Sequence, residues 1–174
     1  MASNIDEELH RMVKGIVDDL EAAVSGSLYD IDGNYVVIDD MDDWKADRYE
    51  EKADAFRKEH PEESYDPEVY GFDTYGEWME DEIGTVDDVD EPDEVSLYDY
   101  LEKESLGDVR FEVGPDKELH GGKTLFCCGG PNIWVADDEV RGYWGSATVE
   151  MSLNSETRSA MWNWFEERWD SVKG

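Results

Sequence analysis

Basic residues are scarce in this 174-residue chain, which has 15 Lys and Arg against 47 Asp and Glu and a formal net charge of −32. Proteins that bind nucleic acids neutralise phosphates with clustered Lys and Arg, and an anionic membrane surface makes the same demand. The composition therefore argues against direct binding to nucleic acid or to a membrane. A basic protein is the complementary partner.

Long apolar runs and paired cysteines are lacking too. No apolar run approaches the ~20 residues that a membrane span requires, and the first residues, MASNIDEELH, have neither the basic nor the apolar region of a signal peptide. Cys127 and Cys128 are neighbours, so they provide no disulfide framework and no metal-binding spacing. We therefore expect a cytoplasmic protein whose cysteines are structural.

Signatures of catalysis are few. The P-loop, the dinucleotide-binding fingerprint, the H-E-x-x-H motif and G-x-S-x-G are all absent. His120 and Cys128 would pair as base and nucleophile if they met across a turn, but no third member accompanies them. With 47 carboxylates, chance pairs at glycosidase separation carry no information. We expect no enzymatic activity, no catalytic residue and no cofactor.

A calcium-type pattern is incomplete. Asp30, Asp32 and Asn34 resemble the start of a calcium loop, but Tyr35 replaces the glycine of the sixth position and Met41 replaces the glutamate of the twelfth. The same residues are typical of a hairpin turn. We predict a turn and no metal site, and a divalent-cation-binding module stays an alternative.

The apolar content is that of a folded protein, since 39% of residues are hydrophobic and 12% aromatic, including seven Trp. The acidity is regional: the first 108 residues have a net charge of −28 and the last 66 only −4. Asp39–Glu94 contains 24 acidic and five basic residues, a net of −19. Adaptation to high salt explains this poorly, because it would coat every surface and deplete Lys, and the chain has eight Lys and seven Arg.

Periodicity predicts a mostly helical N-terminal part. Apolar spacing, capping residues and breakers indicate helices from Ile5 to Val24, Trp44 to Glu59, Tyr75 to Ile83 and Leu97 to Gly107. Leu28–Ile38 is predicted as a hairpin around Asp32-Gly33. Breakers leave residues 61–73 irregular, and 84–95 is predicted as an exposed acidic connector.

The C-terminal part predicts an antiparallel meander followed by a helix. Its short strand-like segments are Val109–Val113, Lys123–Cys128, Asn132–Ala136, Val140–Trp144 and Ala147–Leu153. The final Trp-rich helix, with Met161, Trp162 and Phe165 on one side, is placed to cover one sheet face. We therefore predict an α+β fold with an acidic, mainly helical region at 1–107 and a sheet plus helix at 108–174, which also fit one continuous fold.

Acidic residues at helical spacing form candidate partner-binding rows. Carboxylates three or four positions apart have Cβ atoms ~5–6 Å apart, and duplex DNA carries one charge per ~1.7 Å of axis, so such rows imitate a phosphate track. The candidate residues are Asp43, Asp47, Glu50, Glu51, Asp54, Glu77, Glu80, Asp81, Glu82, Asp87, Asp88, Asp90, Glu91, Asp93 and Glu94. Most aromatic residues of the strands and the last helix are interpreted as core. Trp164 falls off the main apolar stripe and is a candidate exposed anchor.

The C-terminal stretch CGGPNIWVADDEVRGYWGSATVEMSLNSETRSAMWNWFEERW resembles the tail of small accessory proteins carried by bacterial phages and mobile elements. A Gly-Gly-Pro-Asn strand, a Gly-Tyr-Trp-Gly strand and an aromatic helix recur in those proteins. With its small size and extreme acidity, the chain is similar to anti-CRISPR and antirestriction proteins, several of which occupy the DNA groove of a defence nuclease. The resemblance implies no catalytic residue, and it implies a site of action in the host bacterial cytoplasm.

The resulting hypothesis is a DNA mimic that inhibits a defence nuclease by blocking a basic DNA- or PAM-binding channel of a CRISPR effector or restriction enzyme. An acidic adaptor or regulator that sequesters another basic host protein has the same charge pattern. The two differ in the partner that a salt-sensitive capture would identify.

Overall fold

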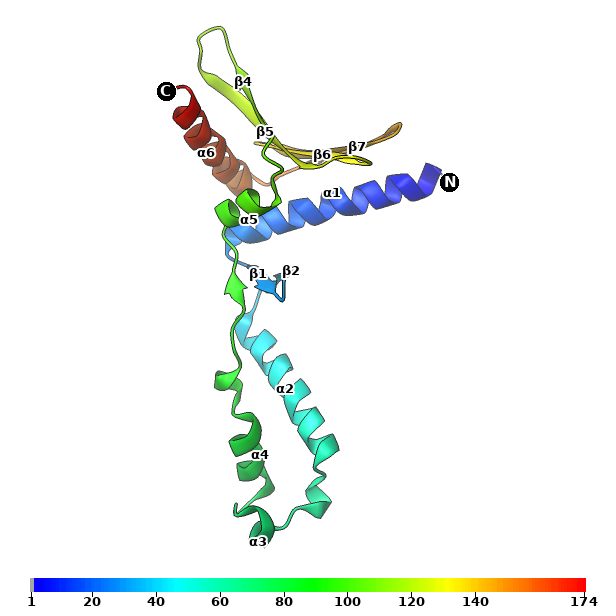
Figure 1. The fold of residues 1–174 in the computed structure, drawn as a ribbon, viewed down its shortest axis with the longest axis vertical. Coiled ribbons are helices and arrows are strands. Elements are labelled where there is room, and N and C mark those ends of the chain that lie inside the picture. Colours follow the sequence, from blue (N-terminus) through cyan, green and yellow to red (C-terminus); the bar gives the residue numbers. More distant parts are fainter. Residues whose placement is uncertain (1) are drawn as a thin grey trace. The chain divides into compact units, whose positions relative to one another are not determined.

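A computed structural model of the protein describes residues 2–174 (Figure 1). Its helices are α1 (Ala2–Ser25), α2 (Met41–Glu59), η1 (Glu62–Ser64), α3 (Pro67–Tyr70), α4 (Tyr75–Ile83), η2 (Val86–Asp88), α5 (Leu97–Glu104) and α6 (Ser155–Val172). Its strands are β1 (Leu28–Ile31), β2 (Asn34–Val37), β3 (Asp93–Glu94), β4 (Val109–Val113), β5 (Leu119–Cys127), β6 (Asn132–Ala136), β7 (Glu139–Trp144) and β8 (Ala147–Ser152).

The chain divides by its internal contacts into two compact units. The core unit comprises the residues up to Val37 together with Glu94–Gly174, and the acidic unit comprises Ile38–Asp93. The acidic unit is therefore an insertion within the core unit, and residue 107, the boundary suggested by the sequence, lies inside the core unit. Each unit is described by itself below.

The core unit is built on a five-stranded antiparallel meander in the order β4-β5-β6-β7-β8, with helices packed against it. This confirms the predicted α+β fold. The strand register places Thr124, Val135, Val140 and Met151 side by side across β5 to β8. Because side chains alternate along a strand, these positions share the face that turns toward the helices.

Helix α1 packs on β7 and β8, although more than 100 residues separate them in the chain. Leu9, Val13 and Leu20 follow one side of the helix and are fully buried. Gly142 of β7 permits the close approach, because a Cβ there would stand 2.8 Å from side-chain atoms of both Leu9 and Val13. A larger residue would push the helix off the sheet.

Helix α6 packs on β5 in a similar way. A Cβ on Gly122 would lie 2.5 Å from the ring of the fully buried Phe165. Figure 1 shows α1 and α6 along the same side of the meander. The last helix therefore covers a sheet face, as the sequence predicts, and it shares that face with the first helix.

A second, small sheet has the strand order β2-β1-β3. Val37 pairs with Leu28 on one side, and the backbone N–H of Val95 donates to the Leu28 carbonyl on the other at 2.8 Å. Neighbouring strands lie ~4.8 Å apart, so the two points where the insertion leaves and re-enters the core unit are about 10 Å apart. The Asp32-Gly33 turn of the hairpin is confirmed, with the Gly33 N–H donating to Asp30 Oδ1 at 2.8 Å.

Two tyrosines connect this hairpin with α1 and α5. The Tyr35 hydroxyl donates to Glu104 at 2.8 Å, and the Tyr100 hydroxyl donates to Asp19 at 3.3 Å. The two rings meet edge to face at 5.0 Å. Burial raises the pKa of Asp19, and the hydrogen bond from Tyr100 offsets only part of that effect.

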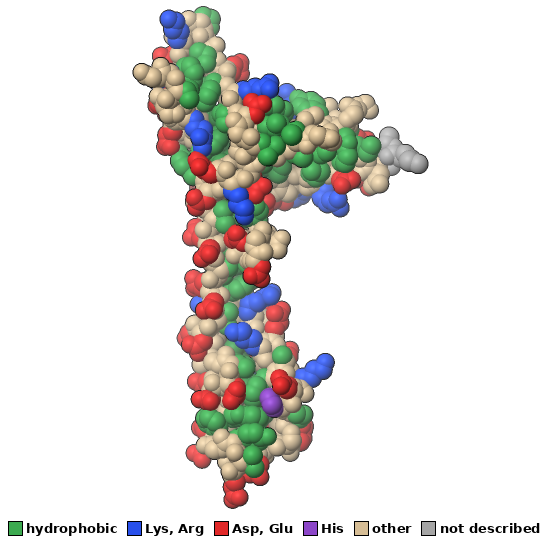
Figure 2. Space-filling model, viewed as in Figure 1, with side chains coloured by type: hydrophobic (Ala, Val, Ile, Leu, Met, Phe, Trp, Pro, Cys, Tyr) green, Lys and Arg blue, Asp and Glu red, His purple; other side chains and the backbone are tan. Residues whose placement is uncertain are grey.

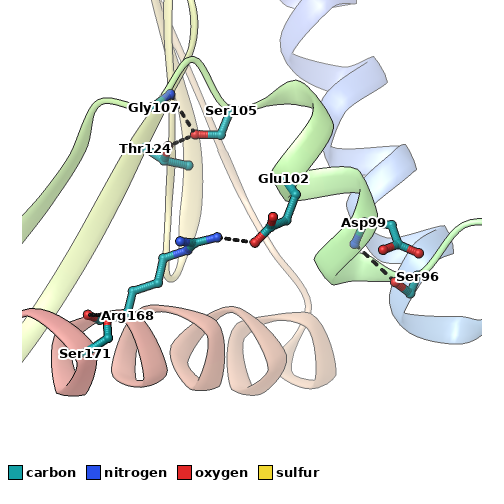
Figure 3. Close-up of polar contacts among 8 residues, drawn as sticks. All are labelled: Ser96, Asp99, Glu102, Ser105, Gly107, Thr124, Arg168 and Ser171. Carbon is teal, nitrogen blue, oxygen red and sulfur yellow. Dashed lines mark hydrogen bonds and ion pairs between the residues drawn. The ribbon is translucent and has the colours of Figure 1, made fainter.

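Helix α5 is fixed to the sheet and to α6 by side-chain contacts (Figure 3). Ser96 caps its N-terminus by accepting from the Asp99 N–H at 3.1 Å. Glu102 accepts from Arg168 of α6, and the Ser105 hydroxyl contacts the Thr124 hydroxyl of β5. Helix α5 thus closes one end of the core, with Leu101 fully buried beneath it.

The acidic unit pairs α2 with α4 and joins them through η1 and α3. Asp40 caps α2 and Thr74 caps α4, each accepting a backbone N–H at 3.1 Å. The sequence predicted an irregular segment at 61–73, whereas the structure has two short helical turns there. The reason is local: Asp66 accepts the Glu68 N–H at 3.0 Å, and Pro67 at the first helical position favours a turn of helix.

Candidate functional site

The structure places all fifteen predicted carboxylates on exposed side chains. Fourteen belong to the acidic unit, and Glu94 is the first residue of the core unit after the insertion. The acidic unit contains 23 acidic and five basic residues, a net charge of −18 in 56 residues. The core unit has a net charge of −14 in 118 residues, so the insertion is the more densely charged part of the molecule.

The row on α2 shares one side of that helix. Successive residues are rotated by 100°, which places Asp43, Asp47 and Asp54 roughly opposite the buried side chains of Ala53 and Phe56. These carboxylates face away from α4, against which the buried side packs. The helical spacing predicted from the sequence is therefore present in the structure.

Basic residues of the same helix neutralise part of this row. Arg57 contacts Glu50 at 3.7 Å and Asp54 at 3.0 Å, and Arg48 contacts Glu51 at 3.3 Å. Exposed ion pairs of this kind add little stability, but they lower the charge that α2 presents to a partner. The α2 row is thus a weaker phosphate imitation than its carboxylates alone suggest.

The segment after α2 lacks this neutralisation within its own sequence. All five basic residues of the acidic unit lie on α2, and residues 59–93 contain 15 acidic residues without a Lys or Arg. Glu77, Glu80 and Asp81 share the side of α4 opposite the buried Trp78. The carboxylates of α4 and of the connector therefore form the strongest negative surface of the described chain.

Two connector carboxylates also have structural contacts. Glu91 pairs with Lys45 of α2 at 3.1 Å. Asp88 accepts hydrogen bonds from the Thr85 N–H at 2.8 Å and from the Thr85 hydroxyl at 3.1 Å, and these bonds hold the pKa of its carboxyl below the ordinary value. Asp88 therefore keeps its charge at lower pH while it caps η2.

A cluster of aromatic rings holds α2, α3 and α4 together. Trp78 is buried, with ring centroids 5.0 Å from Phe56, 4.2 Å from Tyr70 and 5.5 Å from Tyr65. The Tyr75 hydroxyl donates to the His60 carbonyl at 2.6 Å. A small aromatic core thus supports the charged surface, and the sequence analysis identified its residues on α2 and α4 without joining them to the loop between.

The predicted exposed anchor Trp164 is wrong. Its exposed fraction is only 2%, its ring meets Phe165 edge to face at 4.9 Å, and the Arg168 guanidinium covers it at 4.1 Å from the ring centroid. Trp164 leaves the main apolar stripe because α6 is contacted on a second side, where Arg168 pairs with Glu102 of α5 (Figure 3). This side chain belongs to the core.

A second surface was not identified from the sequence. The meander face opposite α1 and α6 contains a cavity of about 650 Å³, and Arg110 and Lys123 each lie 4.7 Å from the ring centroid of Trp134 there. Alternation along β4, β5 and β6 could have separated these residues from the core. The cavity lining also includes Glu112, Asp137, Asp138 and Glu139. Its positive charges are therefore matched by carboxylates.

The structure separates the two residues considered for nucleophilic catalysis. His120 is the second residue of β5 and Cys128 follows its last residue, so at ~3.3 Å per residue they are roughly 25 Å apart. His120 contacts Asp116 at 3.2 Å instead. Among residues 2–174, no group of three or more His, Cys, Asp or Glu side chains is arranged to hold a metal ion.

Comparisons with known proteins give no match. No protein-family model, no curated protein and no solved structure is similar to this chain at a significant level. None of the helices in the described part of the chain is long and apolar enough to cross a bilayer. The functional argument therefore depends on the geometry and charge described above.

Proposed function

We propose that the protein is a stoichiometric inhibitor of a host defence nuclease, of the anti-CRISPR or antirestriction kind, and that it acts as a DNA mimic. Its acidic unit occupies a Lys/Arg-lined DNA- or PAM-binding channel in the bacterial cytoplasm. The observation that carries the proposal is the exposed surface of α4 and the connector, within a segment of 15 acidic residues without a Lys or Arg.

The charge spacing on α4 supports this assignment. Glu77, Glu80, Asp81 and Glu82 fall within six residues, and a helix rises 1.5 Å per residue, so they supply roughly one charge per 2 Å of axis. Duplex DNA supplies one per ~1.7 Å. A channel shaped to neutralise phosphates meets a similar linear charge density on this helix.

The proposed mechanism is competition without chemistry. DNA binding releases counterions in proportion to the phosphates that are neutralised, and an acidic protein surface that neutralises the same Lys and Arg gains the same favourable term. Electrostatic steering makes association fast and sensitive to salt. Neither a cofactor nor a catalytic residue takes part.

The direct test measures target-DNA binding by purified CRISPR effector and restriction complexes at physiological salt, with and without equimolar protein. Binding is expected to fall as the protein is added, and to recover at higher salt. The triple variant Glu77→Gln, Glu80→Gln, Asp81→Asn should inhibit less, because it removes three charges from α4.

The matched control is Asp6→Asn, Glu7→Gln, Glu156→Gln, which removes the same number of exposed charges from the core unit. It should inhibit as well as the unaltered protein. The proposal fails if DNA binding by these complexes is unchanged by the protein, or if the two triple variants lose inhibition equally.

A further inference from the structure

The loop between α2 and α4, residues 61–73, exposes apolar side chains; we call it the apex. Val69 is 70% exposed, the highest fraction among the large hydrophobic side chains of the described chain, and the neighbouring Tyr70 is 41% exposed. Pro61 and Pro67 are exposed beside them. Single exposed apolar residues are normal on protein surfaces, but here several adjoin within one short segment.

Hydrogen bonds and ring contacts hold the apex in a defined shape. The Val69 N–H donates to the Asp66 carbonyl at 3.1 Å, and the Gly71 N–H donates to the Pro67 carbonyl at 2.8 Å. The Tyr65 hydroxyl donates to the carbonyl of Phe72, across the loop. Since the Tyr70 ring also stacks on Trp78 at 4.2 Å, the exposed side chains are presented by an ordered support.

Carboxylates surround these apolar side chains. Figure 2 shows hydrophobic side chains at the surface of the end of the acidic unit that carries α3, with Asp and Glu side chains beside them. The exposed acidic residues of this region are Glu59, Glu62, Glu63, Asp66, Glu68 and Asp73. Residues 59–73 contain no Lys or Arg, so a partner that covers the apex must bring the positive charge.

We infer that the apex binds an arginine-bearing segment of the basic partner, a deduction that rests on the proposed function. The aliphatic part of the arginine side chain packs on Val69. Its guanidinium lies against the Tyr70 ring and pairs with the surrounding carboxylates. Arginine suits this surface better than lysine, because its planar group stacks on aromatic faces and forms forked hydrogen bonds with carboxylates.

This contact gives the acidic unit a means of selecting its partner. Charge complementarity alone attracts any basic surface and acts mainly on the association rate. A contact that combines an exposed apolar pair with fixed carboxylates acts on the dissociation rate and requires a matching side chain. The apex therefore deepens the proposed inhibitor role by supplying the specificity that the α4 row lacks.

The test compares the binding of labelled oligoarginine and oligolysine peptides of equal length to the full chain, by fluorescence anisotropy at fixed salt. We expect oligoarginine to bind roughly two- to fivefold more tightly. Tyr70→Leu should abolish that preference. Val69→Ser should weaken oligoarginine binding by about fivefold through lost apolar contact, without a change in its salt dependence.

Val172→Ser is the control, because Val172 is 63% exposed on α6 in the core unit; it should bind both peptides as the unaltered chain does. Hydrogen exchange of α2 and α4 verifies the fold of each variant, and Val69→Ser decides the question if Tyr70→Leu unfolds the unit. Equal affinities for the two peptides, or equal binding by Val69→Ser and Val172→Ser, would overturn the inference. Inhibition of DNA binding tests the proposed function separately, so either idea can fail alone.

Discussion

At the scale of single residues, Asp19 is the carboxylate that differs most from the many exposed ones. It lies half-buried on α1, where burial raises its pKa and Tyr100 donates a hydrogen bond to it. A carboxyl whose folded-state pKa is raised favours folding most fully below its unfolded pKa of about 3.9. That contribution is lost as the pH rises through the folded-state pKa.

Asp19→Asn should therefore stabilise the core unit at pH 7. The amide stays neutral while its oxygen still accepts from Tyr100, so the unfavourable burial of a charge is removed. The advantage should shrink as the pH falls toward about 3, where Asp19 is protonated as well. Urea unfolding followed at both pH values measures the difference.

Asp18→Asn supplies the comparison for this experiment, since it removes the same charge from the exposed neighbouring position on α1. Asp18 pairs with Lys14 at 2.7 Å, so its replacement should change stability little or lower it slightly. If Asp19→Asn is no more stable than Asp18→Asn at pH 7, the proposed burial penalty is wrong.

Trp164 shows where residue-level prediction fails. Helical periodicity correctly identified Met161 and Phe165 as core, and both are fully buried. It placed Trp164 outside that stripe because it assumed one buried face. Helix α6 is contacted by the sheet and also by Glu102 of α5 through Arg168, and no local pattern in residues 155–172 reveals that second neighbour.

At the scale of elements, helix boundaries followed from short-range chemistry. Thr74, Ser96 and the Asp32-Gly33 turn were recognised in the sequence, and each acts as expected. The docking of α1 on β7 and β8 was not predicted, because its contacts join residues more than 100 positions apart. Gly142 looks like an ordinary strand glycine until Leu9 and Val13 are seen against it.

The acidic unit depends on one aromatic residue to an unusual degree. Its buried hydrophobic side chains are few, and Trp78 contacts rings from α2, α3 and α4's own first turn. Trp78→Ala should cost about 3–5 kcal/mol of the unit's stability. That is a large share of the total for a small unit, so the unit should unfold locally.

Hydrogen exchange resolved by segment measures this effect. Amides of α2 and α4 should lose protection in Trp78→Ala, while those of β4 to β8 keep it. Val86→Ala, at a position 36% exposed in the same unit, should leave protection unchanged. Persistent protection of α2 in Trp78→Ala would show that the aromatic cluster is not what holds the unit together.

At the scale of the whole molecule, charge is distributed unevenly between the units, −18 in 56 residues against −14 in 118. The regional acidity and the exposure of the candidate carboxylates followed from the sequence. Their unequal neutralisation did not, because it depends on Arg48 and Arg57 meeting carboxylates of their own helix. The apex was missed for another reason: its short helix α3 has too few residues for a periodic signal.

Salt should stabilise the acidic unit more than the core unit. Between 0.01 M and 1 M ionic strength the Debye length falls from about 30 Å to about 3 Å, which screens repulsion among exposed carboxylates. Exchange protection of α2 and α4 should rise with NaCl more steeply than that of the meander. The variant Glu77→Gln, Glu80→Gln, Asp81→Asn should show a smaller rise. An equal salt response in both units would contradict this picture.

The insertion begins and ends on either side of Leu28, at points about 10 Å apart. Two neighbouring exits of this kind let one contiguous stretch of the gene be lengthened, shortened or replaced while the sheet and its helices keep their packing. The surface of the acidic unit is therefore free to change under selection at a pace of its own. A lineage facing a new opponent could rewrite 56 codons and leave the scaffold untouched.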